Sequence, residues 1–186
     1  MTIEMPRSRD EILAALDRVH AESARYWTSF STPTFFAPIE SAWSPADNIR
    51  HLNKSIRAVT RGLQKRRFVL RLLFGRPQEA SRPYDQLRDD YHRALEQGGQ
   101  AGTFAPTLRG FPANAEAERA RILRAHAANV CDIDDAARAW PDALLDQYRL
   151  PHPLLGKLTI REMLFFTLYH SQHHVDVVRR RLAQKH

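Results

Sequence analysis

The segment HSQHH, from His170 to His174, places three of the chain's nine histidines within five positions. Residues four apart lie on one face of an α-helix, so the rings of His170 and His174 would project side by side. Such an H-x-x-x-H pair can chelate one metal ion. His173 is turned to the edge of the same face. The pair therefore indicates a metal site, and plain packing or a solvated helix surface is the alternative for two histidines alone.

A third imidazole has to come from another helix, and His51 is the candidate. It follows the segment WSPAD, in which Ser44 can cap a helix that begins at Pro45. The residues in line with His51 along that helix are small or polar, which would leave room beside the ring. They are Asn48, Ser55, Ala58 and Gly62. The alternative is a partly buried histidine whose hydrogen bonds are satisfied.

Three neutral imidazoles suit Zn²⁺, Ni²⁺ or Co²⁺ and leave coordination positions for water or substrate, as catalytic sites do. Such an ion lowers the pKa of a bound water or holds a thiolate. Ser171 and Gln172 follow the first histidine, so the glutamate of an H-E-x-x-H protease is missing, as are G-x-S-x-G and phosphate-binding glycine motifs. We therefore expect metal-bound water or thiolate as the reactive species, and no catalytic side chain is assigned.

Helix signals account for most of the remaining sequence. Ser8 and Glu11 predict a capping box at the start of the first main helix, and Thr159 and Glu162 predict one at the start of the last. The apolar stripe that follows Pro45 allows the second helix to continue through RRFVLRLLFG. Further helical segments are predicted in SRPYDQLRDDYHRALEQGG and from about residue 115 to 140.

The segments between these helices read as connections. Prolines break STPTFFAP and LPHPLLG, QAGTFAPTLRGFP is a loop, and no run alternates convincingly with the period of a strand. We therefore predict an all-α fold, a bundle of four main helices with an extra helical excursion between the second and the third. It would form a single domain over residues 1–186.

Composition limits the class of protein. A chain of 186 residues with 43% hydrophobic and 26% charged residues fits one globular domain. No apolar run reaches the length of a membrane span, and the N-terminus lacks the apolar segment of a signal peptide. The single Cys131 excludes an internal disulfide framework. We expect a cytoplasmic protein without a membrane partner.

The net charge of +7 is concentrated in one segment. Between Asp47 and Glu79 there are nine lysine or arginine residues and no acid. A basic segment can bind nucleic acid. The first four cations, however, are spaced along one exposed helical face, and no recognised nucleic-acid motif accompanies them. We expect a solvated helix face and treat a nucleic-acid-binding protein as the less favoured hypothesis.

Two stretches resemble motifs of a known family. WSPADNIRHL, followed far downstream by HPLLGKLTIREMLFFTLYHSQHH, is similar to the DinB/YfiT-like superfamily. The likeness covers most of the chain and includes the order of the helices and the spacing of the histidines. It implies an up-down-down-up four-helix bundle whose metal ligands are His51, His170 and His174. His173 matches a frequent neighbour of the last ligand that does not itself bind.

Members of this superfamily are described as metal-dependent hydrolases, as transferases of thiols such as bacillithiol or mycothiol, or as thiol-dependent maleylpyruvate isomerases. The resemblance implies a metal-dependent enzyme, a hydrolase or a thiol transferase, that acts on a small molecule. Zn²⁺ or Ni²⁺ are the leading ions, and a low-molecular-weight thiol is an optional cofactor. A metal-binding bundle without turnover, with a role in stress response or assembly, is the alternative.

The segment RFVLRLLF, residues 67–74, carries more apolar side chains than one amphipathic face can bury. Because members of the superfamily often pair through bundle helices, we predict a homodimer. The alternative is that Phe68, Leu72 and Phe74 pack beneath the helical excursion of the same chain.

The loop GGQAGTFAP contains three glycines and one large aromatic residue, Phe104. Glycines permit backbone motion, and loops on a rigid bundle frequently carry function. We expect Phe104, with Trp43, to line an apolar entrance over the metal that admits a small substrate. The alternative is that Phe104 only anchors the loop to the bundle.

Overall fold

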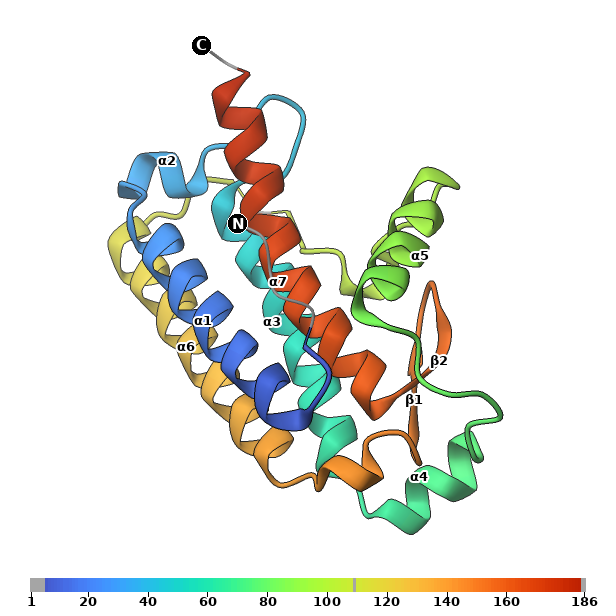
Figure 1. The fold of residues 1–186 in the computed structure, drawn as a ribbon. Coiled ribbons are helices and arrows are strands. Elements are labelled where there is room, and N and C mark those ends of the chain that lie inside the picture. The colour runs from blue at the N-terminus through green and yellow to red at the C-terminus, as the bar shows by residue number, and fades with distance from the viewer. Residues whose placement is uncertain (1–5, 109, 185–186) are drawn as a thin grey trace.

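Four long helices form a bundle in the computed structural model, which describes residues 6–108 and 110–184 (Figure 1). Three of them begin at the predicted caps. The side chains of Ser8, Ser44 and Thr159 each accept a hydrogen bond from a backbone N–H three residues on, and Glu11 and Glu162 complete capping boxes. The four helices are α1 (Arg9–Thr28), α3 (Pro45–Leu63), α6 (Ala115–Arg138) and α7 (Ile160–Ala183).

Contacts between α1 and α6 show that these helices are antiparallel. Arg138 at the end of α6 binds Asp17 in the first half of α1. Arg119, near the start of α6, donates to the carbonyl of Thr28 at the end of α1.

The other two helices complete the topology. Arg50 of α3 pairs with Glu118 near the start of α6, and Trp140, just after α6, donates to the carbonyl of Leu63, so α3 and α6 are parallel. Arg161 at the start of α7 donates to the backbone just before α1, so these two helices begin side by side. The chain therefore runs up, down, down and up, as the family resemblance implied.

The predicted excursion consists of α4 (Arg67–Phe74) and α5 (Tyr84–Glu96). The sequence allowed α3 to continue into this region, but α3 ends at Leu63. The indole N–H of Trp140 donates a hydrogen bond to the carbonyl of Leu63, and the chain turns before α4 begins as a separate helix. α5 packs against α7, on the side of the bundle away from α1 and α6 (Figure 1).

Two short elements lie where the sequence predicted only connections. The segment STPTFFAP contains α2 (Thr32–Phe36), capped by Ser31. The segment LPHPLLG lies in an antiparallel hairpin of β1 (Arg149–His152) and β2 (Gly156–Thr159), so the reading of this segment as a plain connection was wrong. Each strand has four residues, which is too short for alternation to stand out, and Pro151 interrupts the first.

The apolar core is divided into two clusters along the bundle. One contains Ile49 and Leu52 of α3, and the other begins with Ile56 on the same helix. On α7, the division falls between Leu168 and Val175. The candidate metal ligands lie at this division. No helix in the described ranges is long and apolar enough to cross a membrane.

The apolar residues of α4 are largely exposed. Phe68 is 65%, Leu72 81% and Leu73 55% exposed, whereas Phe74 packs against the core. Packing within the same chain therefore accounts for Phe74 but not for Phe68 or Leu72. The homodimer stays a prediction. We expect light scattering at micromolar concentration to give twice the mass of the chain, and a monomeric mass would contradict it.

A buried histidine outside the metal centre predicts a pH dependence of stability. His126 is 5% exposed, and its Nδ1 lies 2.8 Å from Oδ1 of Asn53. Burial, assisted by the nearby His20, lowers the pKa of His126 to about 4. Below the ordinary pKa of about 6.5, the unfolded chain therefore binds a proton that the folded chain does not, and stability falls as the pH falls toward 4.

We expect this residue alone to cost about 2 kcal/mol of unfolding free energy between pH 7 and pH 5. Urea unfolding of the wild type and of His126→Gln, measured at both pH values, isolates the part of the loss in unfolding free energy that comes from His126. The variant should lose less stability on acidification than the wild type. Equal losses would show that His126 is not a proton-linked group.

Candidate metal centre

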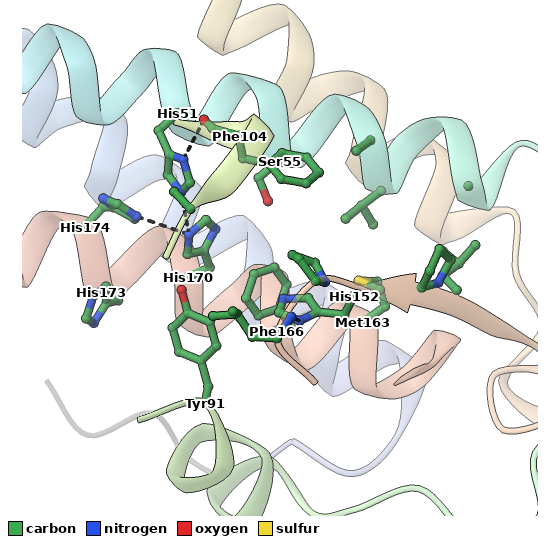
Figure 2. Close-up of a pocket in the computed structure, with 18 of the residues that line it drawn as sticks. His51, Ser55, Tyr91, Phe104, His152, Met163, Phe166, His170, His173 and His174 are labelled. Atoms are coloured by element: carbon green, nitrogen blue, oxygen red, sulfur yellow. Dashed lines mark hydrogen bonds between the residues drawn. The ribbon is translucent and has the colours of Figure 1, made fainter. Parts of the chain in front are cut away.

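The helices α3 and α7 bring the three predicted histidines together (Figure 2). Nε2 of His170 lies 3.0 Å from Nε2 of His51 and 3.1 Å from Nε2 of His174. All three side chains are buried, and one nitrogen of each lies within 4.8 Å of the others. The fold thus unites a residue of the second main helix with a pair near the C-terminus.

A backbone carbonyl fixes the tautomer of His51. Its Nδ1 lies 2.9 Å from the carbonyl oxygen of Phe104, which can only accept, so Nδ1 carries the hydrogen. In the neutral ring, Nε2 is then left with a lone pair, and this atom faces the other two histidines. Lys54, one turn from His51, donates to the next carbonyl, that of Ala105, so α3 holds this loop at two adjacent positions.

An amide side chain fixes the tautomer of His174. Its Nδ1 lies 2.7 Å from Oδ1 of Asn48. The other end of this amide is also engaged, because Nδ2 of Asn48 donates to the carbonyls of Ser44 and Trp43. The oxygen of Asn48 therefore faces the imidazole, Nδ1 of His174 carries the hydrogen, and Nε2 again has a lone pair.

Nε2 of His170 lies between the Nε2 lone pairs of His51 and His174, and it carries at most one hydrogen. That hydrogen can point at one neighbour only, so at least one of the two close contacts has no hydrogen bond along it. Burial holds the pKa values of His170 and His174 well below their ordinary value, which disfavours relief by an added proton. Burial lowers the pKa of His51 as well.

A divalent cation is the group that fits this donor set. It would engage all three lone pairs at once, and the outer nitrogens of His51 and His174 already have the hydrogen-bond acceptors that metal-binding histidines need. Two nitrogens on a tetrahedral ion, with bonds of about 2.0–2.1 Å, would be roughly 3.3 Å apart. Two of the three separations, 3.0 and 3.1 Å, are close to that value, and the third is no more than 4.8 Å.

Aromatic rings restrain the imidazoles. Trp43 lies parallel to His174, with ring centroids 6.3 Å apart and an interplanar angle of 4°. Phe166, one turn before His170, stacks on it with centroids 4.8 Å apart. These contacts limit rotation of the rings and keep bulk water from the cluster, so the nitrogens are held in position before any ligand binds.

His173 lies outside the cluster, at the helix edge where the sequence places it. Its Nδ1 lies 3.0 Å from the hydroxyl of Tyr169, which in turn lies 2.6 Å from Nε2 of His92 on α5. Burial, together with the neighbouring His92, lowers the pKa of His173 to about 4. This residue therefore connects α7 with α5 and borders the cavity.

A cavity of about 410 Å³ adjoins the three histidines. Phe104 and Trp43, the two residues expected at an entrance, both line it. The backbone carbonyl of Phe104 also accepts the hydrogen bond from His51, which holds this loop on α3. The role of the Phe104 side chain at a substrate entrance stays a prediction. Most of the other lining side chains are apolar.

Two hydrogen-bond donors stand at the edge of this cavity near the histidines. The ring of Tyr91 is 6.2 Å from that of His170 and 6.1 Å from that of His152. Burial raises the pKa of Tyr91 to about 12, so its hydroxyl keeps its hydrogen at neutral pH. Nδ1 of His152 accepts from the backbone N–H groups of Leu154 and Leu155, which leaves the hydrogen of the neutral ring on Nε2.

Three residues of the site, Asn48, Tyr91 and His152, were not predicted from the sequence. Asn48 was noted only as a polar neighbour, although its position three residues before His51 places both on one helix face. Tyr91 and His152 gave no local signal, because they come from the excursion and the hairpin. Their positions depend on how these elements pack against α7.

Part of the basic segment serves the protein's own structure. Arg50 pairs with Asp47 and Glu118, and Lys54 donates to the loop carbonyl of Ala105. Two further arginines of the segment lie over aromatic rings. Within the described part of the chain, four cations of the segment have neither an ion pair, nor a side-chain hydrogen bond, nor an aromatic ring beneath the charged group: Arg61, Lys65, Arg66 and Arg76.

Comparison with known proteins identifies the family. The family model of the DinB superfamily matches residues 15–178. The chain therefore belongs to the DinB superfamily, and the resemblance seen in its motifs is confirmed. None of the curated proteins in the comparison matches the chain.

Two solved structures are similar over nearly the whole chain. YfiT from Bacillus subtilis, described as a probable metal-dependent hydrolase with an unusual four-helix bundle topology, has a TM-score of 0.59 and 16% identity, with 100% of this chain and 95% of that chain covered. TT2238, described as a four-helix bundle protein, has a TM-score of 0.52 and 20% identity, with 93% and 99% covered. At such identities, the similarity establishes the fold alone.

Proposed function

We propose that the protein is a metal-dependent enzyme that acts on a small molecule, with His51, His170 and His174 as the ligands of one divalent ion. The observation that carries this proposal is the convergence of three buried histidine side chains at their Nε2 atoms. The tautomers of His51 and His174 are fixed by hydrogen bonds from their Nδ1 atoms to Phe104 and Asn48. Zn²⁺ and Ni²⁺ both accept three imidazole ligands. The ion, when bound, would act as a Lewis acid toward a water or a thiol.

The cavity favours an enzyme over a metal-binding bundle without turnover. A structural metal site is closed by protein ligands, whereas three histidines beside an open space leave room for a further group. Trp43 and Phe104 would shield the site from bulk water on one side, which strengthens polar interactions inside it. Tyr91 and His152 would donate hydrogen bonds to a carbonyl or similar oxygen of the substrate and so orient it.

Hydrolysis and thiol transfer are both compatible with this site. None of the described residues that line the cavity has a carboxylate, so these residues supply no acidic general base at the histidines. Proton transfer would depend on neutral groups such as Tyr91 or on solvent. The description of YfiT as a probable metal-dependent hydrolase supports hydrolysis as the first reaction to test. Transfer of a low-molecular-weight thiol is the second, with the apolar cavity holding the acceptor.

We expect one equivalent of metal per chain, and adjacent histidines provide matched variants to test its ligands. Elemental analysis of protein purified without a metal-affinity tag should give about one equivalent for the wild type and for His173→Ala. His174→Ala should lose the metal, because two imidazoles remain and Asn48 has no ring to orient. Added Zn²⁺ should raise the melting temperature of the first two proteins but not of His174→Ala.

Two results would contradict the ligand assignment. One is a full equivalent of metal in both variants, and the other is metal loss in His173→Ala alone. Metal-loaded protein that is inert in both ester hydrolysis and thiol transfer would support the bundle without turnover.

A further inference from the structure

The cavity beside the histidines is long, and its length follows two helices. On α3 it is lined by His51, Ser55, Ala58 and Gly62, which are three or four residues apart and therefore share one face. At 1.5 Å per residue, this line extends about 16 Å along the helix. The small residues beside His51 that stood out in the sequence thus form one wall of a groove.

The opposite wall is the matching face of α7, with Met163 and Phe166 leading up to His170. The two helices are antiparallel, so both walls lead away from the histidines in the same direction. Figure 2 shows Met163 on the far side of His152 from the three histidines. The hairpin covers the remaining side, where Leu150 approaches Gly62 so closely that a Cβ there would lie 2.7 Å from its Cδ1. The middle of the groove is therefore apolar.

Among the described residues, the lysines and arginines that line this groove lie at its distal end. Arg61 and Lys65 line the cavity, at and just beyond the end of α3, and no aspartate or glutamate lines it. Both cations are exposed, and neither makes an ion pair or a hydrogen bond with any described residue. The groove thus has two unpaired positive charges at its mouth, an apolar body, and neutral donors beside the histidines.

We propose that the substrate is an elongated apolar acid, whose anionic group binds between Arg61 and Lys65 and whose opposite end reaches the three histidines. A chain of methylenes or aromatic carbons would lie along Ala58, Leu150 and Met163 and be removed from water there. The cations would attract the acid and fix its direction, so that the reacting group is the one remote from it. This assignment rests on the proposed function, because it names the substrate class of the same site.

The affinity of decanoate tests the proposal without any assay of turnover. Calorimetric titration of the full chain should show one decanoate bound, and decyltrimethylammonium, which has the same tail and the opposite charge, should bind at least tenfold more weakly. Arg61→Gln and Lys65→Gln should each weaken decanoate by about two- to fivefold, the range for an exposed ion pair. Arg66→Gln, an exposed cation beside Lys65 that does not line the cavity, is the matched control and should leave the affinity unchanged.

A second variant tests the apolar body of the groove. Ala58 is exposed at the groove's edge, so Ala58→Phe can place a ring in the groove without disturbing the core. Decanoate should then bind at least tenfold more weakly, while the metal content stays at one equivalent.

The proposal would be overturned by equal affinity for the two ligands or by unchanged decanoate affinity in Arg61→Gln and Lys65→Gln. Loss of decanoate binding only in His170→Ala would also overturn it, because it would place the acid at the histidines. Full metal content without decanoate binding would refute this inference and leave the proposed function intact. Charge-dependent decanoate binding in a protein that takes up no metal would support the inference and refute the proposed function.

Discussion

The close approach of three imidazole nitrogens, with too few hydrogens to join them all, is the constraint around which this site is arranged. The Nε2 atoms of His51, His170 and His174 meet at hydrogen-bonding distance, yet they cannot all be paired by their own hydrogens. Burial disfavours an added proton. The folded chain therefore holds three potential electron-pair donors close together, and a divalent cation would engage all three.

The remainder of the bundle maintains that arrangement. Asn48 and the carbonyl of Phe104 hold the outer nitrogens of two rings. Asn48 is itself held by the carbonyl of Ser44, and Lys54 holds the carbonyl of Ala105, next to Phe104. Trp43 and Phe166 pack against the rings from two sides. Because the cluster lies where the two apolar cores meet, it interrupts neither, and the small residues of α3 leave an open groove beside it.

Much of this could be predicted from local sequence, because caps and helical spacing are local properties. The capping boxes at Ser8 and Thr159 located two main helices, and the four-residue spacing of His170 and His174 placed them on one face. The small neighbours of His51 made it a candidate, but its assignment as a ligand required the family resemblance. The sequence of its own helix does not indicate which face of the last helix it contacts.

The rest depended on contacts between distant segments. The strands of the hairpin are too short for an alternation of polar and apolar residues to stand out. The helix α3 ends at Leu63, where Trp140, far along the chain, donates a hydrogen bond to the carbonyl. The tautomers of His51 and His174 are likewise set by tertiary contacts. Tyr91 and His152 join the site only through the packing of α5 and the hairpin on α7.

The most direct test of the central claim is the protonation state of the three rings, measured by ¹⁵N NMR of the imidazole nitrogens in metal-free protein near pH 7. His51 and His174 should both be neutral, with the hydrogen on Nδ1 and a lone pair on Nε2. One equivalent of Zn²⁺ should then shift the Nε2 signals of these two residues and of His170, and leave that of His173 in place. A hydrogen on Nε2 of His51 or His174, or Zn²⁺ shifts confined to His173, would contradict the account.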